Sequence, residues 1–561
     1  MSEPLLQIDN LSIFFQQQRA ASNISLSVRK GEVLAIVGES GSGKSVTSLS
    51  IIQLLSKNAV IYGDIFLDDG GRKINLVHLP SKGLQQIRGN KIAMIFQEPM
   101  TSLNPVKTCG HQILEAILLH EKITKHEAYK KVIALFNEVQ LPEPESIYHC
   151  YAHQISGGQK QRVMIAMAMC CNPELLICDE PTTALDVLVQ KEILLLIKEL
   201  QQQNNMSVMF ISHDLNLVAE IADRIAIFHQ GHIVEIGTAD QILHAPKHAY
   251  TKALLACRPA LYSKGQRLPV VADFLSDEKF SVKNKVENKN ASSPKNSKAT
   301  LLSVKNLNIR YVAKQNIFGK VLNYNKAVTD VSFDVYENEM LGLVGASGCG
   351  KTTLGRSIMQ LVQPHSGEII YNGRNIFGNS TKENHSLTTE IQMIFQDPYA
   401  SLNPKLSIGL AIGEPLRVHC LYPEKEIKNK VVEWLEKVGL NASHYHRYPH
   451  EFSGGQRQRI VIARALIMQP KFVICDESVS ALDVSVQAQV LNLLNDLKQE
   501  MNFTSIFISH DLSVIKYLCD RVIVMNKGKI EETGTAEQIY YYPKSAYTKQ
   551  LLNALPKTFT T

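Results

Sequence analysis

The sequence contains no apolar run long enough to cross a membrane as a helix. Its hydrophobic stretches all fall short of the roughly 18 to 20 residues that such a helix needs. The opening residues, MSEPLLQIDN, contain neither the basic segment nor the apolar segment of a secretion signal. We therefore expect neither a membrane anchor nor a secretion signal, and we expect the chain to act in the cytosol.

Neither sign of charge is in strong excess, and the cysteines show no metal-binding pattern. The net charge is +6, from 59 basic and 53 acidic residues, so the composition does not indicate a nucleic-acid or anionic-lipid partner. The 10 cysteines are scattered and lack the spacing of metal ligands. We expect free thiols in a reducing compartment.

Most of the motifs in the sequence occur twice. The stretch ISGGQKQR at 155–162 returns as FSGGQRQR at 452–459, and LLICDEPTTALDV at 175–187 returns as FVICDESVSALDV at 472–484. Both pairs are separated by 297 residues. A period of this length is too long for a solenoid repeat and indicates a duplicated domain.

The two copies are separated by a segment of different composition. Residues 276–300, SDEKFSVKNKVENKNASSPKNSKAT, are rich in Lys, Asn and Ser and nearly free of aromatic side chains. Such a segment cannot bury enough apolar surface to offset the entropy of ordering. We therefore predict a first domain at 1–262, a flexible linker at 263–300 and a second domain at 301–561.

Each domain carries a glycine-rich loop between a predicted buried strand and a predicted helix. The first follows the strand EVLAIVG at 32–38, and its pattern G-x-x-x-x-G-K-[ST] suits a polyphosphate: the glycines let the backbone wrap around it, the lysine adds positive charge, and the hydroxyl faces Mg²⁺. The loop residues expected to bind nucleotide are Gly38, Ser40, Gly41, Ser42, Gly43, Lys44 and Ser45, then Gly345, Ser347, Gly348, Cys349, Gly350, Lys351 and Thr352.

Two acids end a second predicted strand in each copy. Asp179 and Asp476 are placed to hold Mg²⁺, and the next residues, Glu180 and Glu477, are placed to polarise an attacking water. The alternative is a pair of acids that merely caps a turn. The neighbouring phosphate loop favours the catalytic interpretation.

Polar side chains also end the remaining strands. His213 and His510 each follow a predicted strand, and their recurrence at the same strand end favours catalysis over a structural role. Gln97 and Gln396 follow IAMIF and IQMIF, and their amide oxygens suit a metal ion or water.

A serine and two glycines open a predicted helix in each copy, at Ser156, Gly157 and Gly158 and at Ser453, Gly454 and Gly455. Such a helix start leaves backbone N–H groups free for an anion. No phosphate loop lies next to either corner in sequence.

Together these motifs resemble those of the ATP-binding-cassette (ABC) ATPases, over nearly the whole chain outside the linker. The resemblance implies an α/β fold with two P-loop NTPase domains in tandem, each with a RecA-like core, a helical subdomain and an antiparallel β subdomain. It implies that each SGG corner binds the γ-phosphate of an ATP held by the opposite domain. The loop at Lys44 is then expected to face Ser453, and the loop at Lys351 to face Ser156.

The resemblance also places an adenine-stacking aromatic early in each domain. It falls at Phe15 in the first copy and at Tyr311 in the second. An ordinary core aromatic is the alternative interpretation. Since neither copy has lost its glutamate or its signature serine, we expect two sites that hydrolyse ATP, although Ser478 stands where the first copy has Pro181.

Three tasks fit a double cassette: a membrane importer, a ribosome-acting ATPase, and a DNA-repair or chromosome ATPase. The linker contains Asn, Ser and Pro, which oppose the helical arm of the ribosomal class. No zinc pair or sustained heptad supports the DNA class. IFQEPMTSLNP at 95–105 and the tails APKHAYTKALL and YPKSAYTKQLL instead resemble the dipeptide, oligopeptide and nickel importer ATPases. Within that group the fused double cassettes of glutathione importers look closest, and those of microcin C and peptide importers are near neighbours, so glutathione, short peptides and a peptide antibiotic stay open as substrates.

That resemblance implies the partners and the location. We expect two permease subunits and an extracytoplasmic binding protein, no nucleic acid, and a peripheral position on the cytoplasmic face of the bacterial inner membrane. The cofactors implied are ATP and Mg²⁺, without an iron–sulfur cluster. Permease docking is expected at 98–103 and 397–402 and along the helices that follow.

Overall fold

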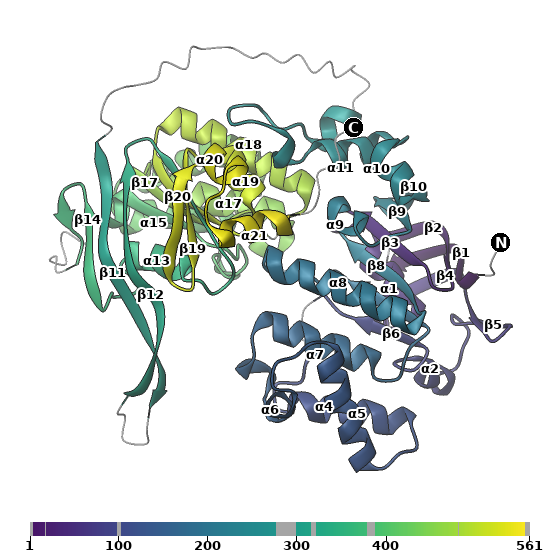
Figure 1. Cartoon of the computed structure of the whole chain (residues 1–561). Helices are drawn as coiled ribbons and strands as arrows, with labels where there is room; N and C mark the ends of the chain where they lie inside the picture. The colour runs from purple at the N-terminus through teal and green to yellow at the C-terminus, as the bar shows by residue number, and fades with distance from the viewer. Residues whose placement is uncertain are drawn as a thin grey trace.

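Two similar α/β halves lie side by side in the computed structural model (Figure 1). The structure describes residues 4–16, 18–97, 102–183, 185–275, 299–315, 321–377, 387–480 and 482–555. Within these ranges each half contains a six-stranded sheet, a four-stranded antiparallel sheet and a group of helices, which confirms the predicted tandem α/β architecture.

The six-stranded sheet of the first half carries the strand ends that the sequence singled out. Its central strands are buried along their whole length, as expected for parallel strands covered on both faces. Only the edge pair β9–β10 is antiparallel. The strands, in sheet order, are β10 (His232–Thr238), β9 (Arg224–His229), β3 (Val33–Gly38), β8 (Ser207–Ser212), β7 (Leu175–Asp179) and β6 (Ile92–Ile95).

The four-stranded antiparallel sheet packs against that core. One hydrophobic cluster joins Leu6 and Ile8 of the small sheet to Leu34 and Ile36 of β3. The strands, in sheet order, are β2 (Gln18–Arg29), β1 (Pro4–Phe15), β4 (Ala59–Asp69) and β5 (Arg72–Asn75).

A helical subdomain lies below the sheets in the view of Figure 1. Its α5 begins with a capping box, in which the Thr124 side chain and Glu127 satisfy each other's backbone N–H groups. The elements are α4 (Cys109–His120), α5 (Lys125–Glu138), α6 (Pro144–His149), η1 (Ala152–Gln154) and α7 (Gly157–Met169). The other helices of this half are α1 (Lys44–Ile51), α2 (Ser81–Ile87), α8 (Val187–Asn204), α9 (Leu215–Ala219), α10 (Ala239–His244) and α11 (Ala249–Ala256).

The second half repeats this arrangement. Its six-stranded sheet, in order, is β16 (Ile391–Ile394), β17 (Phe472–Asp476), β18 (Thr504–Ser509), β13 (Met340–Val344), β19 (Arg521–Asn526) and β20 (Lys529–Thr535). Its four-stranded sheet is β12 (Val321–Tyr336), β11 (Thr300–Gln315), β14 (Ser366–Tyr371) and β15 (Arg374–Asn375). The helices are α13 (Lys351–Ile358), α15 (Ile408–Val418), α16 (Glu424–Lys437), η3 (Ala442–His446), η4 (Pro449–Glu451), α17 (Gly454–Leu466), α18 (Val484–Met501), α19 (Leu512–Leu518), α20 (Ala536–Tyr541) and α21 (Ala546–Ala554).

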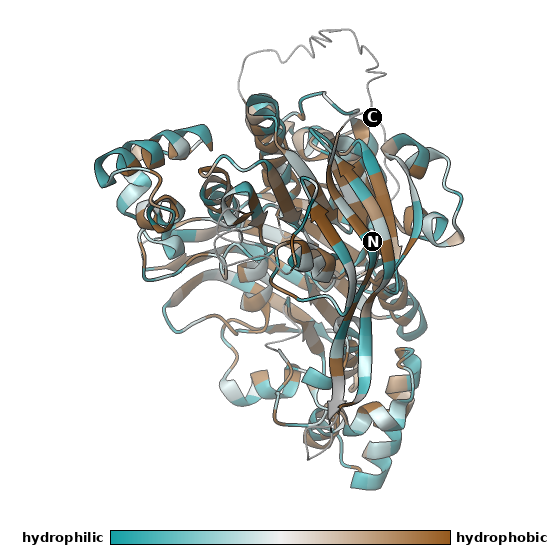
Figure 2. Cartoon of the chain, turned by 90° about the vertical axis from the view of Figure 1, so that its left-hand side faces the viewer, coloured by the Kyte–Doolittle hydropathy of each residue, from teal (hydrophilic) through white to brown (hydrophobic). Residues whose placement is uncertain are grey.

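The halves differ in the length of the first hairpin. Strands β11 and β12 have 16 residues each, against 12 for β1 and β2, and they extend away from the body in Figure 1. Figure 2 shows the apolar strands gathered in the interior and the hydrophilic surfaces on the outer helices. The fold therefore buries the central strands of its six-stranded sheets and leaves edge strands, helix faces and one hairpin to the solvent.

The predicted flexible linker from residue 263 is corrected over its first part. Residues 263–275 are ordered, end in the short helix α12 (Val271–Leu275), and lie against the second half, where Leu268 is 1% exposed. The apolar side chains of RLPVVADFL explain the difference, because they have surface to bury. Residues 276–298, the Lys- and Asn-rich part of that prediction, lie outside the described residues.

Two further expectations can be compared with the fold. Over the described ranges, no helix combines the length and the hydropathy that crossing a membrane requires. All ten cysteines are free thiols, as expected.

Candidate functional site

Each phosphate loop joins the end of a central strand to the start of a helix. In the first half the loop runs from Gly38, the last residue of β3, to Lys44, the first residue of α1. Gly43 has a φ of 98°, and a Cβ there would lie 2.7 Å from the carbonyl oxygen of Ala20, so glycine is required on both counts. The equivalent Gly350 has a φ of 104°.

The loop lysines lie inside the loop. Lys44 is 4% exposed, and its Nζ donates to the carbonyl oxygens of Gly38 (2.7 Å) and Glu39 (2.8 Å). Lys351 does the same with Gly345 (2.8 Å) and Ala346 (3.0 Å). Burial lowers the pKa of Lys44, although the charge of Glu180 opposes the change.

The hydroxyl that follows each lysine contacts the predicted metal-binding aspartate. Ser45 Oγ donates to Asp179 Oδ1 at 3.0 Å, and Thr352 Oγ1 donates to Asp476 Oδ1 at 3.0 Å. Burial raises the pKa of Asp179 to about 6 and raises that of Asp476 as well. Within the described ranges, no three His, Cys, Asp or Glu side chains converge to form a metal cluster.

The glutamate of the first half is held by side chains from three strand ends. Glu180 Oε2 accepts hydrogen bonds from Gln97 Nε2 (3.1 Å) and Thr183 Oγ1 (3.0 Å), and it lies 3.4 Å from His213 Nδ1. Burial opposes ionisation of Glu180, but His213 and Lys44 outweigh it and lower the pKa of Glu180 to about 2. For His213, burial is outweighed by Glu180, so its pKa is raised.

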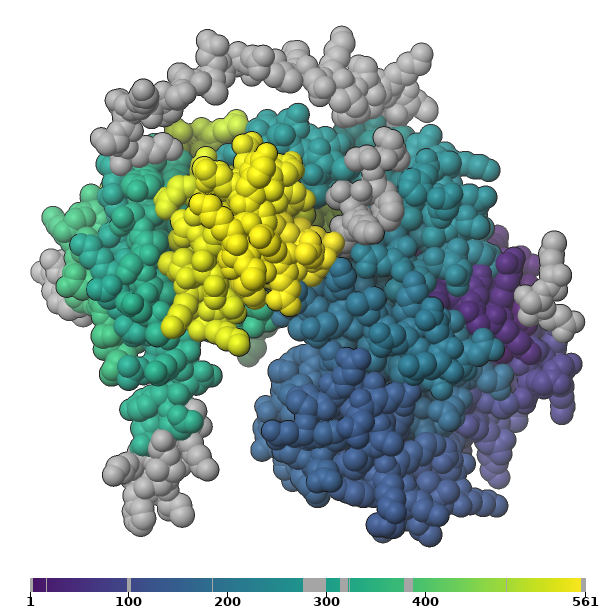
Figure 3. Space-filling view, in the orientation of Figure 1, coloured from purple at the N-terminus to yellow at the C-terminus, as the bar shows by residue number. Residues whose placement is uncertain are grey.

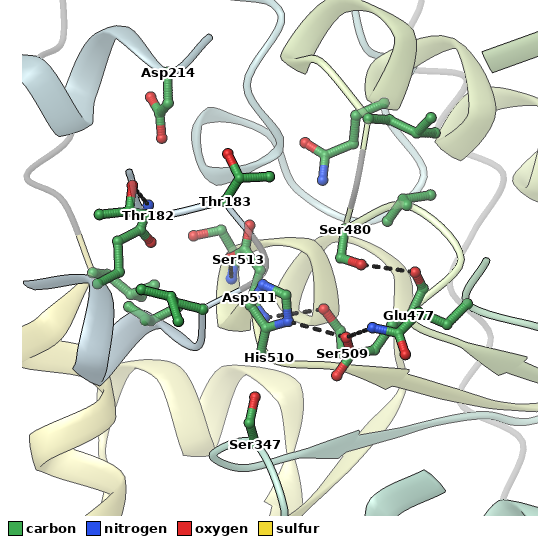
Figure 4. Close-up of a pocket in the computed structure, with 18 of the residues that line it drawn as sticks. Thr182, Thr183, Asp214, Ser347, Glu477, Ser480, Ser509, His510, Asp511 and Ser513 are labelled. Atoms are coloured by element: carbon green, nitrogen blue, oxygen red, sulfur yellow. Dashed lines mark hydrogen bonds and ion pairs between the residues drawn. The ribbon is translucent and has the colours of Figure 1, made fainter. Parts of the chain in front are cut away.

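The second half builds the same arrangement around Glu477 (Figure 4). Glu477 Oε2 accepts from Gln396 Nε2 at 2.7 Å and lies 3.5 Å from His510 Nδ1. Its other oxygen lies 4.0 Å from Lys351 Nζ. Burial works against ionisation of Glu477, and His510 and Lys351 outweigh it, so the pKa of Glu477 is lowered. The structure thus brings the predicted strand-end residues of each half together.

Each SGG corner is the start of a long helix. Ser156 caps α7, and its Oγ accepts from the Gln159 backbone N–H while the Gln159 side chain accepts from the Ser156 N–H. Ser453 and Gln456 form the same capping box at α17. Both serines are exposed.

Contacts between the halves involve the phosphate loops. Asp483, the N-cap of α18, accepts from the Ser40 backbone N–H (3.0 Å) and from Ser40 Oγ (3.1 Å). In the other direction, Asp186 Oδ2 accepts from the Ser347 backbone N–H at 3.2 Å. Each loop is therefore contacted by the helix that follows the acid pair of the opposite half.

The SGG corners pack against the starts of these two helices, α8 and α18. A Cβ on Gly158 would lie 2.9 Å from Val189, on the first turn of α8, three residues after Asp186. A Cβ on Gly455 would likewise collide with Val486, three residues after Asp483. Each corner is thus packed on the helix start that contacts the opposite phosphate loop.

A cavity of about 490 Å³ lies between the halves. It is lined by Glu180, His213 and Asp214 of the first half and by Lys351, Glu477 and His510 of the second, among others. Figure 4 shows Asp214 and Thr183 on one side, with Ser480, His510 and Glu477 on the other. In Figure 3 the C-terminal elements of the second half, in yellow, lie against the first half.

The predicted adenine-stacking aromatics occupy different surroundings. Phe15 is half-buried and packs against the core between the two sheets of the first half. Tyr311 is 43% exposed on β11. Their role stays a prediction.

Sequence reasoning missed the residues that join the halves. Asp186 and Asp483 belong to the repeated stretch ALDV, which was noted as a repeat but given no role. Glu39 accepts a hydrogen bond from Ser485, and this bridge has no counterpart in the second loop, where Ala346 stands. The recurrence of ALDV after both acid pairs is the only sequence signal that could have pointed to Asp186 and Asp483.

The chain matches known families over most of its length. The family model described as ABC transporter matches residues 21–183 and 328–480, and the model described as the oligopeptide/dipeptide transporter C-terminal region matches 234–277. The chain is 46% identical over 99% of its length, and 90% of theirs, to glutathione import ATP-binding proteins GsiA of Salmonella choleraesuis (strain SC-B67) and Salmonella paratyphi A.

A match of similar strength is the GsiA of Escherichia coli (strain K12), at 46% identity over 98% of this chain and 89% of that protein. Among solved structures, the dimeric ATP-binding cassette MJ0796 bound to ADP and Pi is 26% identical, covers 42% of this chain and 98% of its own, and has a TM-score of 0.38. On the family models and on relatives of this identity and coverage, the chain belongs to the ABC transporter ATPases of the oligopeptide/dipeptide transporter family.

Proposed function

We propose that this chain is the ATP-hydrolysing subunit of an importer that takes up glutathione or short peptides through separate permease subunits. ATP would bind at two composite sites, each made from one phosphate loop and the SGG corner of the opposite half. The reciprocal contact of Asp483 with Ser40 and of Asp186 with Ser347 carries the composite sites. The family models and the relatives carry the importer role.

Packing supports the head-to-tail pairing. Because Gly455 packs on the helix start whose Asp483 reaches Ser40, the corner at 453–455 belongs beside the loop of Lys44. The same reasoning pairs the corner at 156–158 with the loop of Lys351. The exposed serine and the first-turn N–H groups of each long helix then suit the terminal phosphate of the nucleotide.

The residues present fit a magnesium–nucleotide complex. The Ser45–Asp179 and Thr352–Asp476 pairs place a hydroxyl and a carboxylate together beside each phosphate loop, and oxygen donors of this kind suit Mg²⁺. Gln97 and Gln396 would add an amide oxygen. The ion would neutralise phosphate charge when bound.

The side chains of each site are poised to activate water. Glu180 and Glu477 stay ionised at neutral pH despite their burial, and an ionised carboxylate can accept a proton from an attacking water. Their lowered pKa makes them weaker bases than a free carboxylate, so their placement beside the phosphate loop is the stronger support. His213 and His510 hold these carboxylates in place. The lysines supply positive charge where the transferred phosphoryl group becomes negative.

Separate glutamate variants test whether both sites hydrolyse ATP. We expect the steady-state turnover of Glu180→Gln and of Glu477→Gln to be about half of the wild-type value or lower. Loss of the base slows its own site by about 100-fold or more. Turnover is measured by phosphate release from the full chain. Unchanged turnover in either variant would contradict the two-site proposal.

Exposed apolar side chains support docking to permeases. Val106 (79% exposed) and Leu119 (77%) belong to the helical subdomain of the first half, and Tyr399 (52%) and Val418 (63%) to that of the second. Leu103 and Leu402, at the ends of the predicted docking segments, are buried, and Glu98 lies outside the described residues. The docking surface is therefore proposed for the exposed side chains around these segments.

Co-expression separates the importer from the ribosomal alternative, which the comparisons do not support. We expect the chain to sediment with membranes only when its permeases are present, and Val106→Asp to weaken that association. Glu180→Gln/Glu477→Gln protein that instead co-sediments with ribosomes would contradict the proposal. Stimulation of ATPase activity by glutathione or peptide in the assembled complex with its binding protein would identify the substrate.

A further inference from the structure

Residues 258–275, called the crossing segment below, leave the first half and run onto the second. At its start, Arg258 is 5% exposed and its Nη1 donates a hydrogen bond to Asn216 Oδ1. Asn216 belongs to α9, and its backbone N–H donates to Asp214 Oδ1 at 2.9 Å. The start of the crossing segment is therefore connected to the loop that carries His213.

The middle of the crossing segment lies on α19, the helix that begins two residues after His510. The short helix η2 (Pro259–Leu261) packs against α19. The Tyr517 hydroxyl on α19 donates to the carbonyl oxygen of Gln266 at 2.6 Å. Lys264 Nζ lies 2.6 Å from Asp520 Oδ1. These contacts connect the segment to α19 and to Asp520, which follows that helix.

The far end of the crossing segment is fixed by one asparagine of α18. The Leu268 backbone N–H donates to Asn492 Oδ1 (2.9 Å), and Asn492 Nδ2 donates to the Leu268 carbonyl (2.8 Å). Asn492 is 4% exposed and Leu268 is 1% exposed. Two buried hydrogen bonds from one side chain to one backbone residue set a single register for the segment.

The chemistry for this docking exists on one half only. At the offset of 297 residues, Leu195 replaces Asn492 and is 48% exposed, and Glu220 replaces Tyr517. Leu555 replaces Arg258. The duplicated fold therefore offers two equivalent helix faces, but only that of the second half carries the groups that bind the segment.

We propose that the crossing segment is a strut that positions His213 relative to the second half, so that the two ATP sites are coupled and unequal. Arg258, Asn492 and Tyr517 are its positioning residues: they act through the His213 loop and through α19, and Arg258 also lines the cavity between the halves. The proposal rests on the composite sites proposed above. Movement of α19 is transmitted along the segment to α9, and the part of the second half that the structure describes shows no equivalent path.

The test uses the full chain with Asn492→Leu, which installs the residue of the first half, combined with Tyr517→Phe. We expect hydrogen exchange at residues 213–219 to accelerate about tenfold, because local opening there loses its support. We also expect the Hill coefficient for ATP hydrolysis to fall toward about 1, because the coupling between sites is lost. Arg258→Leu is a second variant with the same expected results, should the double variant fail to fold.

Arg267→Ala is the matched control. Its ion pair with Asp496 lies in the same segment but is exposed (72% and 55%), so both readouts should stay at their wild-type values. Unchanged exchange at 213–219 and an unchanged Hill coefficient, in a variant whose residues 263–275 exchange faster, would overturn the strut. A wild-type chain without cooperativity would overturn it as well.

A variant of the second SGG corner, Gly454→Ala, distinguishes failure of the strut proposal from failure of the composite-site proposal. If Gly454→Ala lowers ATPase activity while the strut variants behave as wild type, only the strut is wrong. If Gly454→Ala has no effect on activity, the proposal of composite sites is wrong. The strut proposal, which rests on it, is then wrong as well.

Discussion

The two glutamates proposed to activate water occupy a backbone conformation that few non-glycine residues adopt. Glu180 has a φ of 46° and Glu477 a φ of 45°, both in the left-handed region. Each follows a fully buried strand and is held by a glutamine and a histidine from neighbouring strand ends. The surrounding hydrogen bonds thus keep a strained residue aimed at the site.

At the same scale, Asp483→Ala tests the contact between the halves. Asp483 accepts two hydrogen bonds from Ser40, and bonds to a charged group contribute about 1.5 to 3 kcal/mol each. Because these groups are exposed, we expect the lower end, and an ATPase rate about tenfold lower. Asp186→Ala removes one such bond but also the cap of α8, where Asp186 Oδ1 accepts from the Val189 backbone N–H, so it should lower the melting temperature as well as phosphate release. Equal activity of Asp483→Ala and wild type would contradict the importance of this contact.

The two glycines of the second SGG corner should behave differently. A Cβ on Gly454 meets nothing within 4 Å, so Gly454→Ala should leave the melting temperature unchanged but lower ATPase activity, because it places a methyl group where a phosphate is proposed. A Cβ on Gly455 collides with Val486, so Gly455→Ala should destabilise the fold by about 1 to 3 kcal/mol. Thermal unfolding and phosphate release measured together separate the two effects.

At the scale of elements, one acid in each half fastens the loop before the last helix. Glu235 accepts from the backbone N–H groups of Lys247 (2.7 Å) and His248 (3.1 Å), and Glu532 accepts from those of Lys544 (2.8 Å) and Ser545 (3.0 Å). The duplicated tails therefore share a structural reason for their position. In the first half, this loop sets where the crossing segment begins.

The ionisation of Glu235 makes that fastening dependent on pH. Burial opposes its ionisation, but hydrogen bonds from Thr251, Lys247 and His248 outweigh it and lower the pKa below the usual 4.5. Glu235→Gln should cost about 1 kcal/mol at pH 7, allowing for partial exposure. A depressed pKa stabilises above about pH 4.5 and loses its effect as the pH falls through the folded value. The difference in melting temperature between the wild-type chain and Glu235→Gln should therefore be constant from pH 7 to 5 and shrink below about pH 4.5. A difference that stays constant at pH 4 and below would contradict this.

Elements that follow local patterns were predictable from the sequence. The strand 32–38 and the helix starts at Ser156 and Ser453 are found where buried strand patterns and capping residues predict them. The crossing segment was divided in the prediction between the first domain, up to residue 262, and the flexible linker, from residue 263. Its order comes from Asn492 and Tyr517, more than two hundred residues later in the chain.

At the scale of the whole molecule, the halves are joined by polar contacts in both directions. Besides the phosphate-loop contacts, Lys191 Nζ on α8 donates to the Asn553 carbonyl on α21 at 2.7 Å, and the crossing segment adds its own bonds. The covalent connection is thus one of several. The halves contact each other through the phosphate loops, through α8 and α21, and through the crossing segment.

Cutting the chain between the halves tests this. A protease site inserted within 276–298, then cleaved, should leave two fragments that co-elute in size-exclusion chromatography, because the crossing segment stays on the first fragment and still binds α18. The same cleavage in Asn492→Leu/Tyr517→Phe protein should release part of the fragments. Complete separation of the fragments from the wild-type chain would contradict the prediction.

The sequence alone determined the duplication, the fold class and the chemistry of each half, because phosphate loops, acid pairs and capped helices depend on residues that are neighbours in the chain or end adjacent parallel strands. The family resemblance already implied that each half completes the loop of the other, but tertiary structure alone decided the contacts of Asp186 and Asp483 and the docking of residues 258–275. Those features depend on side chains that meet only when two folded surfaces pack together, and no local pattern records such a meeting.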